Sequence, residues 1–69
     1  MPDELEVRFT YHPPTGDQPE RYARIRAKAL DLARMIDADT PPSREQSLAF
    51  THLEEAVMWA NAAIARRES

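Results

Sequence analysis

The chain has 69 residues, a formal net charge of −3 and no cysteine. The missing cysteine excludes disulfides and thiolate zinc sites and fits a cytosolic protein, while the acidic balance argues against a dedicated duplex-DNA binder. No apolar run is long enough to cross a membrane, and the acidic N-terminus lacks an apolar signal core. A chain this small buries too little surface to be stable alone, so oligomerisation is the expected remedy.

The first predicted element is a short strand or extended arm within residues 1–17. Apolar side chains alternate with polar ones through residues 5–11, and a period of two is typical of a strand. Pro13 and Pro14 follow, and they cannot lie inside a helix because proline lacks a backbone N–H. A single strand needs a partner, so the segment would either pair with another subunit or remain an extended arm.

Two helices are predicted next, over residues 18–38 and 44–67. Asp17 and Ser43 each stand three residues before a Glu or Gln, which is typical of a capping box. Apolar residues recur at intervals of three and four residues in both segments, as on one face of a helix. The connection between the segments is short, which makes the helices antiparallel neighbours. The sequence therefore predicts an all-α fold, a two-helix hairpin forming one domain over residues 1–69.

The second helix carries more apolar surface than one partner helix can cover. Beside its main apolar face it has a separate flank, formed by Leu48, His52, Trp59 and Ala63. An exposed patch of this kind usually marks an interface. We therefore expect hairpins to assemble into a helical oligomer; the alternative is that the N-terminal arm covers Trp59 within one subunit.

Arg26 is the most informative candidate binding residue. It falls at the edge of the apolar sector of the first helix, between Tyr22 and Leu30, where a guanidinium is costly unless it is paired. Two interpretations stay open. Arg26 could pair with a carboxylate of the protein, or it could hold a phosphate with two parallel hydrogen bonds.

Further candidate ligand residues, Tyr11, His12 and Pro13, precede the first helix. Tyrosine and histidine rings can stack on a nucleobase, and the helix start that follows offers free N–H groups to an anion. These features suit a nucleotide, although an aromatic arm packed on the hairpin would explain the same residues. Arg66 and Arg67 end the second helix, where they complement the helix dipole and are candidates for a second anion site.

Catalysis finds little support in the sequence, and an enzyme acting on nucleotides is a weaker hypothesis than a binding protein. Glu54 and Glu55 are adjacent, so they diverge on a helix and cannot form a carboxylate dyad. No serine lies in a nucleophile-type turn, and no metal-binding or phosphate-loop motif is present. We therefore expect a binding protein with no catalytic residues, no metal and no cofactor.

Four stretches of the chain resemble the phage helical-hairpin family of cyclic-nucleotide sponges, which has anti-CBASS and anti-Thoeris members. They are FTYHP (9–13), IRAK (25–28), SREQSLA (43–49) and LEEAVMWANAAIAR (53–66). The resemblance implies a protein that acts in the cytoplasm of the infected bacterium. It would hold cyclic oligonucleotide or cyclic ADP-ribose signals without cleaving them, so that the immune effector is never activated.

The resemblance also implies an assembly and a site. Family members form hexamers built as threefold sets of dimers, with cyclic dinucleotides bound between paired subunits. Their dinucleotide pocket uses a tyrosine and a basic residue fifteen positions later, here Tyr11 and Arg26. The family often has lysine at the second position, which leaves the preferred ligand open. Some members bind cyclic trinucleotides near the threefold axis, where Arg66 and Arg67 are the candidates.

One alternative belongs to a different functional class. The chain could be a helical protein-interaction module, such as an inhibitor of a host protein, that uses the Trp59 flank on a foreign partner.

Overall fold

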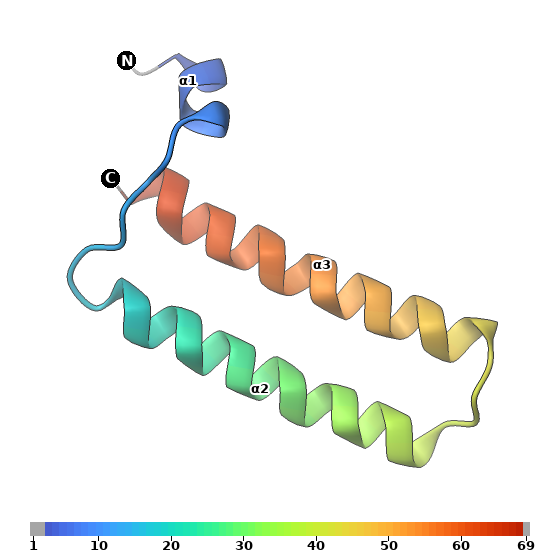
Figure 1. The fold of residues 1–69 in the computed structure, drawn as a ribbon. Coiled ribbons are helices and arrows are strands. Elements are labelled where there is room, and N and C mark those ends of the chain that lie inside the picture. Colours follow the sequence, from blue (N-terminus) through green and yellow to red (C-terminus); the bar gives the residue numbers. More distant parts are fainter. Residues whose placement is uncertain (1–2, 69) are drawn as a thin grey trace.

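A computed structural model describes residues 3–68 and places three helices among them (Figure 1). α1 spans Glu4–Phe9, α2 spans Gln18–Asp39 and α3 spans Arg44–Arg67. α2 and α3 pack side by side as an antiparallel hairpin, and α1 lies at the open end, beside the C-terminal end of α3 (Figure 1). The predicted all-α hairpin is confirmed. The ends of the predicted domain, residues 1–2 and 69, lie outside the described residues.

The short strand or extended arm predicted within residues 1–17 is wrong at Glu4–Phe9, which forms a helix. A side-chain oxygen of Asp3 accepts a hydrogen bond from the Leu5 N–H at 3.0 Å and caps α1. On this helix Leu5 and Phe9 share an exposed face, and Val7 is buried on another. The helix pairs its own backbone groups, whereas a lone strand would leave them unpaired.

The start of α2 differs in detail from its predicted capping box. Asp17 makes no side-chain cap hydrogen bond, and its carboxylate lies 3.2 Å from the Arg21 guanidinium instead. The side-chain oxygen of Gln18 closes the turn by accepting a hydrogen bond from the Thr15 N–H at 3.0 Å. Gly16 allows this turn because its φ of +55° is strained for other residues.

The loop between α2 and α3 is closed by hydrogen bonds from both sides. α2 stops at Asp39, because Thr40 precedes Pro41 and is extended. The Ser43 hydroxyl accepts a hydrogen bond from the Gln46 N–H at 3.1 Å, as the predicted capping box requires. The Gln46 side chain, however, donates to the carbonyl and hydroxyl oxygens of Thr40, each at 3.1 Å, and so ties the loop together.

The core between α2 and α3 is thin, because the molecule measures only 14 Å along its shortest axis. Half-buried apolar side chains line the seam, and they are Tyr22, Ile25, Ala29, Ala33 and Ile36 of α2 with Ala49, Phe50, Leu53, Val57, Ala60 and Ile64 of α3. Large apolar side chains remain outside it, among them Met58 and Trp59, which are 61% and 65% exposed. No helix within residues 3–68 combines the length and apolarity needed to cross a membrane.

Gln18, Arg21 and Glu68 form a clasp at the open end of the hairpin. The Arg21 guanidinium donates to both carboxylate oxygens of Glu68, with Nη1 at 2.8 Å from Oε2. The buried Gln18 amide donates to Glu68 Oε1 at 3.2 Å and to the Ile64 carbonyl at 3.4 Å. Hydrogen bonds from Arg21 and Gln18 lower the pKa of Glu68 from 4.5 to about 2.

A second carboxylate–guanidinium pair fastens α1 to α3. Arg67 Nη1 and Nη2 lie 3.0 and 2.7 Å from the two carboxylate oxygens of Glu4. The Arg67 hydrogen bonds lower the pKa of Glu4 from 4.5 to about 2 and raise the pKa of Arg67. Because these groups are solvent-exposed, solvent screens the pair and limits its contribution to stability.

Acid should loosen both connections. A carboxyl whose pKa is lowered by folding stabilises the fold above its unfolded pKa, and this contribution is lost as the pH falls through its folded pKa. For Glu4 and Glu68 this stability is lost between about pH 4.5 and about pH 2. We expect the thermal unfolding midpoint, measured by far-UV circular dichroism, to fall across this range.

A matched pair of variants isolates the clasp. Glu68→Gln should lower the midpoint at neutral pH and reduce its fall in acid. Glu45→Gln is the control, because Glu45 joins none of the ion pairs among residues 3–68. An acid-induced fall of equal size in wild type and Glu68→Gln would contradict the assigned role of Glu68.

Candidate functional site

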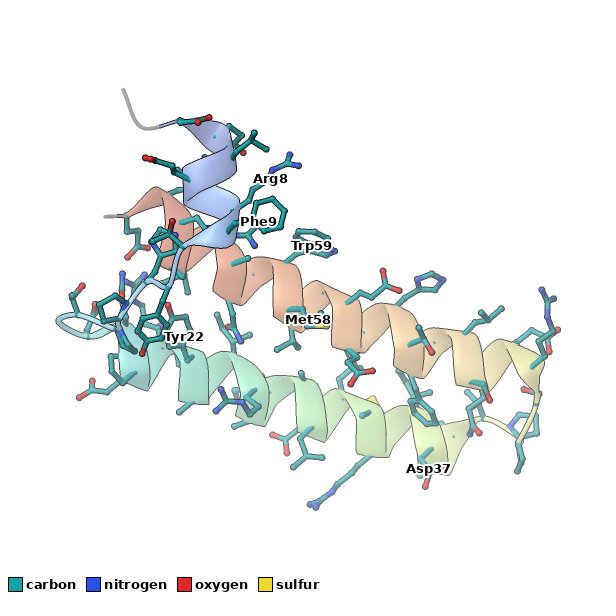
Figure 2. The ribbon with its side chains drawn as sticks, turned by 45° about the horizontal axis from the view of Figure 1, so that its top comes forward. Arg8, Phe9, Tyr22, Asp37, Met58 and Trp59 are labelled. Atoms are coloured by element: carbon teal, nitrogen blue, oxygen red, sulfur yellow. The ribbon has the colours of Figure 1, made fainter. Side chains whose placement is uncertain are left out.

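A groove of about 510 Å³ opens at the junction of the three helices and the segment that joins α1 to α2. Each helix contributes one arginine to its lining: Arg8 of α1, Arg26 of α2 and Arg66 of α3. The rings of His12 and Tyr22 line it as well, and no carboxylate among the described residues 3–68 does. Figure 2 shows Arg8 on α1 and Tyr22 on α2. The groove is therefore locally cationic in a chain whose net charge is −3.

Arg26 forms no ion pair with a carboxylate of residues 3–68. The ion pairs within residues 3–68 involve Arg8, Arg21 and Arg67. Arg26 also lines a neighbouring groove of about 580 Å³ along the α2–α3 seam. Of the two interpretations of Arg26, the structural ion pair is absent from the described residues, and the guanidinium is available to an external anion.

His12 has a structural contact in addition to its place in the groove. Its Nε2 lies 2.7 Å from the Val7 carbonyl oxygen. As the carbonyl can only accept, Nε2 carries the proton in this contact. The bond holds the linker against the last turn of α1, and it fixes the imidazole while the ring lines the groove.

Tyr11 and Pro13 do not line the groove of Arg26. The Tyr11 side chain is 77% exposed. Within one chain, the structure therefore does not bring together Tyr11 and Arg26, the pair that the family resemblance places in one pocket. The exposed ring is instead accessible to a second molecule.

Arg66 and Arg67, the candidates for a second anion site, line a third groove of about 420 Å³. Arg8 and the rings of Phe9 and Trp59 complete its wall, and Figure 2 shows Phe9 of α1 facing Trp59 of α3. Arg66 also lines the groove of Arg26. The two candidates differ in their partners, because Arg67 is held by Glu4, whereas no ion pair of Arg66 occurs within residues 3–68.

Arg8 and Asn61 are among the lining residues of the Arg26 groove that the sequence reasoning did not identify. Arg8 was hidden because its segment reads as a strand, although its spacing of four from Glu4 is the available helical signal. Asn61 lines both the Arg26 groove and the seam groove, and its side-chain oxygen is buried without a hydrogen-bond partner. Its position three residues after Met58 on α3 indicated this face.

The chemistry of the groove suits an anion that carries rings. The guanidiniums of Arg26 and Arg66 can each form parallel hydrogen bonds to phosphate oxygens. Arg8 adds a third cation, although its Nε is bonded to Glu4. His12 and Tyr22 offer faces for stacking. Within residues 3–68 no group of three or more His, Cys, Asp and Glu side chains is placed to hold a metal ion.

A family model described as the Acb2/Tad1 hairpin domain matches residues 1–65. No curated protein and no solved structure matches the chain. The family match covers α1, α2 and α3 as far as Ala65, and so includes the segments on which the resemblance to the anti-CBASS and anti-Thoeris proteins rests, apart from Arg66 at the end of the last one. That resemblance is confirmed: the chain belongs to the Acb2/Tad1 hairpin family.

Proposed function

We propose that this protein binds cyclic oligonucleotide second messengers and sequesters them uncleaved, which blocks the activation of CBASS effectors in the cytoplasm of the infected bacterium. The Acb2/Tad1 family implies a sponge for the cyclic nucleotide signals of CBASS or Thoeris immunity. The observation that carries the proposal is the groove lined by Arg8, Arg26 and Arg66, to which the described part of the chain contributes no carboxylate.

A cyclic dinucleotide matches the groove in size and chemistry. The volume of the groove, about 510 Å³, lies in the usual range for small-molecule sites. The ligand has two phosphates on opposite sides of its ring, and arginines from three helices suit separated phosphates. Cyclic ADP-ribose carries adjacent phosphates instead, so it is the second choice for this groove. A cyclic trinucleotide is the proposed ligand for the Arg66–Arg67 site.

We further propose that the functional form is a homo-oligomer, a hexamer as the family resemblance implies. The exposure of Met58 and Trp59 supports association, because an apolar patch on a thin hairpin is stabilised by burial against another copy. The exposure of Tyr11 supports a shared pocket, in which the ring from one subunit reaches the Arg26 groove of its neighbour.

Sequestration without cleavage is part of the proposal. Hydrolysis of a phosphodiester needs a positioned base or another means of activating the nucleophile. The groove offers one imidazole, and its Nε2 is bonded to the Val7 carbonyl. Its arginines stay protonated and suit binding. The acidic net charge supports the expectation that the protein does not bind DNA.

Arg26→Ala should weaken cyclic dinucleotide binding by at least about tenfold and leave the oligomer intact. A hydrogen bond to a charged group contributes about 1.5–3 kcal/mol, and about 1.4 kcal/mol corresponds to tenfold in affinity. Titration calorimetry with a panel of cyclic dinucleotides, cyclic trinucleotides and cyclic ADP-ribose isomers measures the affinity. Light scattering with and without ligand measures the molar mass.

Arg24→Ala is the matched control, because Arg24 is an exposed arginine of α2 outside the Arg26 groove. It removes the same charge and should change the affinity less than about twofold. Equal weakening by both variants would assign the effect to overall charge. Binding of no ligand in the panel by the wild type would rule out the sponge.

The bound messenger should be recovered intact. After long incubation at a ligand-to-site ratio below one, the protein is denatured by heat and the released nucleotide is analysed by chromatography. We expect the original cyclic compound in full yield. Linear products that accumulate with time, and that are absent from an Arg26→Ala incubation, would show instead that the protein is an enzyme.

A protein-interaction module is the second candidate, favoured by the exposure of Trp59 at 65% and Phe9 at 84%. The sponge hypothesis predicts an oligomer, with a molar mass of at least two chains of 7.9 kDa each, and a Trp59 fluorescence that is protected from acrylamide. A monomer whose Trp59 is fully quenched, and which binds no cyclic nucleotide, would favour the interaction module.

A further inference from the structure

Glu4 occupies the place of an anionic ligand on α3. Its carboxylate accepts hydrogen bonds from Arg67 Nη1 and Nη2 at 3.0 and 2.7 Å, and from Arg8 Nε at 3.3 Å. Both arginines line the third groove together with Arg66 and the exposed rings of Phe9 and Trp59. One internal carboxylate thus holds two of the three cations in that groove.

The geometry of this contact is the one that a phosphate uses. A guanidinium binds a carboxylate and a phosphate through the same pair of parallel hydrogen bonds. An anion therefore cannot take the forked position on Arg67 while Glu4 holds it. The two anions compete for one set of donors.

The structure also makes Glu4 displaceable. The side chains of Glu4 and Arg67 are 50% and 56% exposed, so water screens the pair. α1 has six residues, which is too short for an independently stable helix. Besides Glu4, the burial of Val7 and the bond between the Val7 carbonyl and His12 help to hold it in place.

We infer that Glu4 is an intramolecular competitor that sets the anion affinity and selectivity of the Arg66–Arg67 site. An anion binds there by displacing the Glu4 carboxylate, which frees Arg8 and Arg67 together. Multiply charged anions with spread oxygens bind most favourably, because they reach both released guanidiniums. A weakly charged anion does not compensate for the loss of the Glu4–Arg67 pair. This inference rests on the second anion site proposed above. Because Arg8 and Arg66 also line the Arg26 groove, a separate probe tests it apart from cyclic dinucleotide binding.

Inorganic tripolyphosphate is the probe, and the fluorescence of Trp59, the single tryptophan, reports binding in the groove that it lines. Glu4→Gln should bind the probe about two- to fivefold more tightly than wild type, the range expected for losing an exposed competing pair. Amide exchange of Val7 and Arg8 should quicken in Glu4→Gln, and in the wild type when the probe is added. Arg67→Ala in the Glu4→Gln background should abolish the gain.

Glu6→Gln is the matched control, since it removes the same charge from the same helix and Glu6 joins no ion pair within residues 3–68. Equal tightening by Glu4→Gln and Glu6→Gln would overturn the inference in favour of overall charge. A Glu4→Gln affinity equal to that of wild type would overturn it as well. If neither wild type nor Glu4→Gln binds tripolyphosphate, both the second anion site and the role of Glu4 as its competitor are refuted. Cyclic dinucleotide binding, measured by calorimetry, still decides the proposed function.

Discussion

Two forked carboxylate–guanidinium pairs at the C-terminal end of α3 hold together the three segments around the candidate site, which are α1, the start of α2 and the end of α3. The Glu68–Arg21 pair draws the start of α2 to the end of α3, and the Arg67–Glu4 pair draws α1 to the same place. The linker between α1 and α2 is thereby closed over the hairpin end, where it delivers His12 to the groove. Ion pairs of this kind contribute little to stability when exposed, so their main consequence is the arrangement of the segments.

The same pairs explain how an acidic chain presents a cationic groove. Glu4, Asp17 and Glu68 at the open end are all engaged by arginines. Their charges are neutralised locally, and Arg26 and Arg66 stay outside these pairs. Net charge averages over these groups, so it excludes a broad basic surface but says nothing about a small site.

The hairpin could be predicted because its information is local. Helix periodicity, prolines and the Ser43 cap fix α2, α3 and their loop within a few residues. α1 could not be predicted, because Leu5, Val7 and Phe9 fit a strand equally well and a tertiary contact at Val7 decides between them. The site was predicted in part for the same reason. Arg26 lies on a well-patterned helix, whereas the position of Arg8 depends on how α1 docks.

The thinness of the hairpin connects its stability with its proposed activity. One layer of paired helices cannot bury Trp59 or Met58, so burial of these side chains requires a second molecule, which is another copy in the proposed oligomer. Tyr11 is exposed and does not line the groove of its own chain, so in the proposed oligomer a pocket that contains both Tyr11 and Arg26 would take the ring from another copy. Assembly and ligand binding then involve the same surfaces. A ligand that binds only the assembled form must stabilise it, and the affinity for the ligand must rise with the concentration of the protein itself.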